Sequence, residues 1–104
     1  SLKHVVYFES DGNYTNIFFS NGTKATLLYS LSNMELQINE KLTGMPQPFI
    51  RIGRQYIVNS SYIFQINTLK RQLILNCFDA PLLYTLSVSK EALKKLKEVY
   101  IQKK

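Results

Sequence analysis

The chain has 104 residues, of which 45% are hydrophobic and 12% aromatic, so it can build the core of one folded domain and is not a disordered polymer. Its formal net charge of +6 favours a negatively charged partner. No apolar stretch approaches the length of about 18 residues that spans a bilayer. One cysteine forms no internal disulfide, and we expect no signal peptide and a single cytoplasmic domain, residues 1–104.

The first part of the chain has the pattern of an antiparallel meander. Strands are expected at residues 4–8, 14–19 and 24–28, where β-branched and aromatic residues gather between clusters of turn residues. The second turn contains Asn21-Gly22, a dipeptide typical of a tight hairpin.

The period of the apolar pattern then changes to that of a helix. Apolar residues recur at helical spacing between Leu31 and Leu42, which predicts a helix over about 32–42. Ser32 and Glu35 have the spacing of a capping box at its start. Gly44, Pro46 and Pro48 end it.

The second half returns to β-structure and closes with a helix. Strands are expected at residues 49–52, 55–58, 62–67, 72–78 and 82–88, with a bulge or sharp turn near Gly53, a hairpin turn over 68–71 and another turn over 79–81. Ser89 is placed to cap a closing helix with one apolar stripe. The fold class is therefore mainly β with two peripheral helices.

Arg51 and Arg54 are the most informative residues for function. They flank Gly53 inside an apolar run, and the surrounding segment, residues 42–78, contains no Asp or Glu. Arginines without acidic neighbours on a strand-like frame suit polyanions, because a guanidinium offers a planar donor fork to phosphate or to guanine. The sequence therefore favours nucleic-acid binding.

Enzymatic and metal chemistry find little support. His4 is the one histidine, and neither cysteine nor carboxylate is patterned around it, whereas metal sites need three or four clustered ligands. The seven acidic residues are scattered, and phosphate-binding and nucleophile motifs are missing. We expect no enzyme activity, no cofactor and no metal.

These pieces, in this order, resemble the LytTR family, the DNA-binding output domain of many bacterial two-component response regulators. The resemblance is carried by segments 6–14, 21–22, 49–59 and 86–90, by Leu31, and by Ile63 and Ile66. It implies an elongated arrangement of small antiparallel sheets in which loops, and not a recognition helix, enter successive major grooves.

The resemblance also implies roles for individual residues. Base contacts are expected from Arg54, Lys90, Asn13 and Thr15, and phosphate contacts from Arg51, Tyr14, Lys24 and Lys70. Asn59 is expected to be structural, with its side chain bonding local backbone. The family further implies binding to paired direct repeats in double-stranded DNA, and a receiver domain upstream in a longer regulator.

The chain departs from the family pattern at the same places. The family usually has His, Arg and Ser where this chain has Gly53, Arg54 and Gln55, and Lys90 replaces the more usual Arg. The linking segments 43–48 and 76–81 are longer than is common. The lost histidine and the exchanged arginine are expected to change which site is preferred.

Two other functions remain open from the sequence. The first is a degenerate LytTR-like module that binds protein, which is distinguished by whether Arg51, Arg54 and Lys90 converge on one face. The second is single-stranded nucleic-acid binding, which requires several exposed tyrosines aligned in a basic groove.

Overall fold

The computed structural model describes residues 2–45, 48–77 and 81–102, with side chains described as far as residue 100. Within these ranges the elements are η1 (Leu2–His4), β1 (Val5–Asp11), β2 (Tyr14–Phe19), β3 (Lys24–Leu27), α1 (Leu31–Lys41), β4 (Phe49–Ile52), β5 (Tyr56–Asn59), η2 (Ser60–Tyr62), β6 (Ile63–Asn67), β7 (Gln72–Cys77), β8 (Leu82–Ser87) and α2 (Lys90–Gln102). Every expected strand and both expected helices are present. The expected helix stop at Pro46 and the strand and turn residues 78–80 lie outside the described ranges.

The strands form two antiparallel sheets. The first has five strands in the order β3-β2-β1-β5-β4, and the second has three in the order β6-β7-β8. The prediction of a mainly β domain with small antiparallel sheets and two helices is confirmed. The elongation is modest, because the principal extents are 34, 30 and 26 Å.

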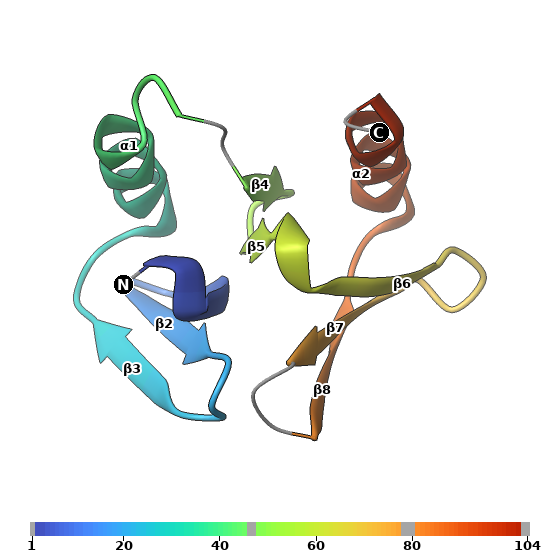
Figure 1. The fold of residues 1–104 in the computed structure, drawn as a ribbon, viewed down its shortest axis with the longest axis horizontal. Helices are drawn as coiled ribbons and strands as arrows, with labels where there is room; N and C mark the ends of the chain where they lie inside the picture. The colour runs from blue at the N-terminus through green and yellow to red at the C-terminus, as the bar shows by residue number, and fades with distance from the viewer. Residues whose placement is uncertain (1, 46–47, 78–80, 103–104) are drawn as a thin grey trace.

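The first sheet is the middle layer of the molecule. Figure 1 shows α1 beside the first sheet, with the second sheet on the other side and α2 above the second sheet. Each face of the first sheet therefore has its own apolar cluster, as strand alternation requires. The smaller cluster, under α1, contains Val5, Phe8, Leu31, Ile38, Phe49 and Ile57.

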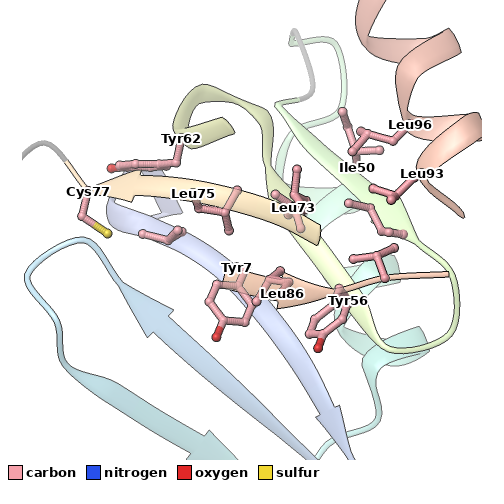
Figure 2. Packing of buried hydrophobic residues seen from close by; sticks show 14 residues of the cluster. Tyr7, Ile50, Tyr56, Tyr62, Leu73, Leu75, Cys77, Leu86, Leu93 and Leu96 are labelled. Carbon is pink, nitrogen blue, oxygen red and sulfur yellow. The ribbon is translucent and has the colours of Figure 1, made fainter. Parts of the chain in front are cut away.

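The larger cluster joins the two sheets and α2. Figure 2 shows side chains of β1, β5, β7 and β8 meeting between the sheets, while Leu93 and Leu96 of α2 reach Ile50 of β4. Leu73 and Leu75 of β7 are fully buried there. This cluster fixes the second sheet and α2 against the first sheet, and so fixes the relative positions of their turns.

The first helix begins differently from the expected capping box. Ser30, and not Ser32, is the N-cap, and its hydroxyl accepts the N–H of Asn33 at 3.1 Å. The predicted box of Ser32 and Glu35 is therefore wrong. The closing helix does start as predicted, because the Ser89 hydroxyl accepts the N–H of Ala92 at 3.2 Å.

Asn59 is structural, as expected. Its side-chain oxygen accepts the N–H of Ser61 at 3.0 Å, which is a local backbone bond. Its amide nitrogen also donates to the Val5 carbonyl at 3.0 Å, which ties the end of β5 to the start of β1. Because the side chain is 2% exposed, both bonds are sheltered from water.

A group of stacked aromatic rings links β1, β2, β5 and β8. Tyr7 stacks on Phe18 with ring centroids 4.3 Å apart, and the rings of Tyr56 and Tyr84 contact it edge-on. Burial raises the pKa of the Tyr7 phenol above its ordinary value of 10.0, with nearby Glu9 adding to the shift, and burial also raises the pKa of Tyr56 and Tyr84.

These shifts predict a loss of stability in alkali. Below pH about 10 the phenols are protonated in both the folded and unfolded states. Above it the unfolded chain loses its phenolic protons first, so the free energy of unfolding falls as pH rises. Denaturation by urea from pH 8 to 12 checks this, and Tyr7→Phe should show a shallower fall. An identical fall in both proteins would contradict the raised pKa of Tyr7.

Candidate nucleic-acid interface

Four connections lie next to one another at one end of the molecule. The β1–β2 turn adjoins the β4–β5 turn, because the Ser10 N–H donates to the Gln55 carbonyl at 2.8 Å. The β4–β5 turn and the β8–α2 junction line a common hollow, made by residues 52–56, 87–89 and 92. The junction adjoins the β6–β7 turn through a 2.9 Å bond from the Val88 N–H to the Arg71 carbonyl. We call this set the turn row.

The turn row carries a basic and polar surface. Its exposed side chains include Asn13, Tyr14, Arg54, Gln55, Lys70, Arg71, Ser89 and Lys90. Asp11 and Glu91 lie at the same end and are also exposed, so the row is basic without being uniformly positive. The structure thus brings together Arg54, Lys90 and the first expected loop, although they are far apart in sequence.

Gly53 produces a sharp turn between β4 and β5. Its φ is +62°, in the left-handed region that glycine adopts without strain. β4 and β5 pair in register up to Ile52 and Tyr56, so the three residues between them form the turn. Of the two expected alternatives, a bulge or a sharp turn, the structure has the turn. Arg54 therefore lies at the tip of a hairpin and is exposed.

Arg51 does not have the unpaired guanidinium that the sequence suggested. Its Nη1 bonds Glu35 Oε1 of α1 at 2.9 Å, its Nε donates to the Gly53 carbonyl at 2.9 Å, and its Nη2 donates to the Arg54 carbonyl at 3.3 Å. The acid-free segment was misleading, because the partner is supplied by a helix 16 residues earlier. We therefore do not assign Arg51 a phosphate contact.

Thr15 has no surface with which to contact a base. Its side chain is fully buried, and its hydroxyl donates to the Tyr29 carbonyl at 2.6 Å. β2 begins at Tyr14, and strand alternation turns the next side chain inward. The expected base contact from Thr15 is corrected: this residue holds the chain after β3 against β2.

A Thr15→Val substitution tests this correction. Valine has a similar shape but no hydroxyl, so the Tyr29 carbonyl loses its donor and the free energy of unfolding should fall by about 1 kcal/mol. DNA affinity of the folded protein should not change. Urea denaturation and a DNA titration check the two parts, and a loss of affinity at unchanged stability would restore the base contact.

Lys24 lies at the other end of the first sheet. It pairs with Phe18 across the β2–β3 hairpin, near Asn21-Gly22 and away from the β1–β2 turn. Its ammonium lies 5.9 Å from the centre of the Phe18 ring. The structure therefore does not bring Lys24 to the turn row, and the expected phosphate contact is not retained.

Gln55 and Arg71 are exposed residues of the turn row that were not among the predicted contacts. Gln55 follows Arg54 at the hairpin tip, and Arg71 ends the β6–β7 turn with a φ of +55°. Arg71 stood beside Lys70 in a predicted turn, so its charge was a usable signal. Gln55 gave no signal, because its position depends on the turn that Gly53 makes.

Other chemistry is not evident in the described part of the chain. Among those residues no three metal-ligating side chains gather in one place. No described helix is long and apolar enough to cross a membrane. Cys77 is buried and belongs to the larger cluster.

Comparisons with known proteins agree with the observed fold. Residues 1–101 match the model of the LytTR family, the LytTr DNA-binding domain. Among solved structures, the fold is similar to the LytTr DNA-binding domain of a protein from Bacillus cereus described as a putative methyl-accepting/DNA response regulator. That likeness has a TM-score of 0.64 at 24% identity and covers 95% of this chain and 83% of the other. No curated protein sequence matches.

Proposed function

This chain belongs to the LytTR family of DNA-binding domains, and we propose that it binds double-stranded DNA sequence-specifically, as a transcription regulator, with its turn row against the major groove. The observation that carries the proposal is the adjacency of the β4–β5 and β8–α2 connections, which presents Arg54 and Lys90 at the same end. Both are exposed cations, and neither is part of an ion pair within the described residues.

The residues of the turn row have two different roles in DNA binding. Arg54 reads a base edge, because its guanidinium offers two parallel donors to guanine. Lys90 and Asn13 are secondary base readers. Tyr14, Lys70 and Arg71 bind phosphates, which sets affinity and its salt dependence without choosing a sequence.

The dimensions suit this mode of binding. The longest extent of the molecule is 34 Å, close to the length of about 34–36 Å for one turn of duplex DNA. The molecule is therefore about as long as one turn of duplex, and the four adjacent connections of the turn row fit within that length. No helix is required to enter the groove, and α2 presents only its first residues to the turn row.

Pairing on DNA and control by an upstream domain complete the proposed function. We propose that the whole chain acts as one domain that pairs with a second copy on direct repeats. We also propose that a receiver domain precedes it in a regulator that acts in the cytoplasm. The chain itself supplies binding and no catalysis in this account.

Single-stranded binding is less well supported. It requires exposed aromatic rings beside the cations. Tyr7, Tyr56 and Tyr62 are in the core instead, and on the turn row Tyr14 is the one exposed tyrosine among the described residues. A single ring does not make a stacking platform.

Selection from a pool of random duplexes tests the proposal. The protein is titrated with the pool at low and moderate salt, and the bound DNA is recovered and sequenced. Enrichment of a repeated motif, with affinity that falls as salt rises, is the expected result. Binding without enrichment would reject sequence reading, and no binding at either salt would favour a protein-binding module.

A further inference from the structure

Arg51 of β4 connects the turn that directly follows it to α1, which lies earlier in the chain. It lies in β4, on the face of the first sheet that α1 covers, since Phe49 two residues earlier packs in the cluster under α1. From there its guanidinium bonds Glu35 of α1 and the carbonyls of Gly53 and Arg54. Each of its three nitrogens has an acceptor.

Two of these acceptors are in the three-residue turn that displays Arg54. A turn of this length has few bonds of its own, and the left-handed Gly53 favours no single conformation by side-chain sterics. The Arg51 guanidinium (the Arg51 fork) bonds the carbonyls of Gly53 and Arg54, and so fixes the orientation of two successive peptide groups. It thereby fixes the direction in which the Arg54 side chain leaves the backbone.

Glu35 holds the fork in place. The carboxylate bonds Nη1 at 2.9 Å, and the two side chains, of Arg51 and Glu35, are 25% and 40% exposed, so the pair is partly sheltered. Because Glu35 lies on α1, it connects the turn to a helix on the opposite side of the first sheet from α2. It also offsets the charge of Arg51, which leaves this arginine less attractive to a phosphate than Arg54.

We propose that Arg51 is a positioning residue, which together with Glu35 preorganises the Arg54 turn and so sets sequence discrimination without touching DNA. The inference rests on the proposed function. A preorganised turn favours the one site whose bases meet Arg54, because the cost of ordering the turn is removed before binding. Random DNA is bound mainly through charge, so its affinity depends little on whether the Arg54 turn is ordered before binding.

Arg51→Lys separates positioning from phosphate contact. Lysine keeps the charge but has one nitrogen, so it cannot bond Glu35 and both carbonyls in the same geometry. If Arg51 positions the turn, affinity for the enriched duplex should fall about tenfold, while random-duplex affinity and the salt slope stay unchanged. If Arg51 binds phosphate, Arg51→Lys should resemble the wild type on both DNAs, which would overturn the proposal.

Glu35 provides the matched pair of variants. The side-chain amide in Glu35→Gln retains an oxygen that accepts from Arg51, whereas Glu35→Ala retains no acceptor. Discrimination between enriched and random duplex should therefore fall in Glu35→Ala and largely recover in Glu35→Gln. Equal discrimination in Glu35→Ala and the wild type would contradict the role of Glu35.

A measurement on the free protein keeps the inference separate from DNA binding. The ¹⁵N relaxation of residues 53–55 should show greater backbone motion in Arg51→Lys than in the wild type, with unchanged relaxation in β1 and β7. Unchanged motion in the turn would overturn the proposal whatever the DNA result. If Arg51→Lys and Arg54→Ala both leave the discrimination between enriched and random duplex intact, the proposed function fails. If Arg51→Lys leaves it intact and Arg54→Ala reduces it, only the positioning role of Arg51 fails.

Discussion

Replacing Arg54 with alanine is expected to weaken binding to the enriched duplex by about 1–3 kcal/mol and to leave binding to random duplex nearly unchanged. Arg54 is exposed at the tip of the β4–β5 hairpin, and its backbone carbonyl accepts a hydrogen bond from Arg51. The backbone of Arg54 is therefore held in place while its guanidinium is accessible to DNA. A guanine that loses its bidentate partner accounts for the full effect. Fluorescence anisotropy with both DNAs measures it.

Lys24→Ala is the matched control for this prediction. It removes the same unit of charge from the same first sheet, but at the end away from the turn row. Its affinity for both duplexes should stay close to that of the wild type. An equal loss on enriched and random DNA in Arg54→Ala would show a phosphate contact instead of base reading, and a loss in Lys24→Ala would place the interface elsewhere.

Leu73→Ala is expected to lower the free energy of unfolding by about 2–5 kcal/mol. Leu73 lies in the middle strand of the second sheet, pairs with Ile66 and Leu86, and is fully buried in the cluster that joins the two sheets. Truncation removes apolar contacts and leaves a cavity that rigid neighbours on both sheets cannot fill. Urea denaturation followed by circular dichroism measures the loss.

The same substitution at Leu69 is the control. Leu69 lies four residues earlier, in the β6–β7 turn, and its side chain is 96% exposed. Leu69→Ala should change stability by no more than about 0.5 kcal/mol. Similar losses at both positions would contradict the described packing of the second sheet. This packing sets where the β6–β7 turn and α2 lie. A less stable core should therefore also hold the connections of the turn row less rigidly.

Local patterns in the sequence predicted the elements well. The alternation of apolar and polar residues, the hairpin dipeptide Asn21-Gly22 and the break at Gly53 each depend on neighbours in the chain. The observed strand β1 extends to Asp11, beyond the expected end at Phe8, because polar residues pair by backbone bonds as readily as apolar ones. The Ser30 cap was missed because Ser32 had the matching partner three residues later.

The candidate site was predicted only in part, since it depends on contacts between distant segments. Arg54, Lys90 and Asn13 fell in connections, and the structure exposes all three at one end. Thr15 and Arg51 were misread because their partners, Tyr29 and Glu35, are 14 and 16 residues away. Nothing in a local pattern distinguishes a paired arginine from a free one.

Mapping DNA contacts by NMR tests the central claim most directly. The ¹⁵N-labelled protein is titrated with the enriched duplex, and amide shifts are followed residue by residue. The turn row as DNA interface predicts that the largest changes fall in residues 12–14, 53–55, 68–71 and 88–90, with little change at Asn21-Gly22 or along α1. Largest changes around Asn21-Gly22 or on α1, with a silent turn row, would contradict it.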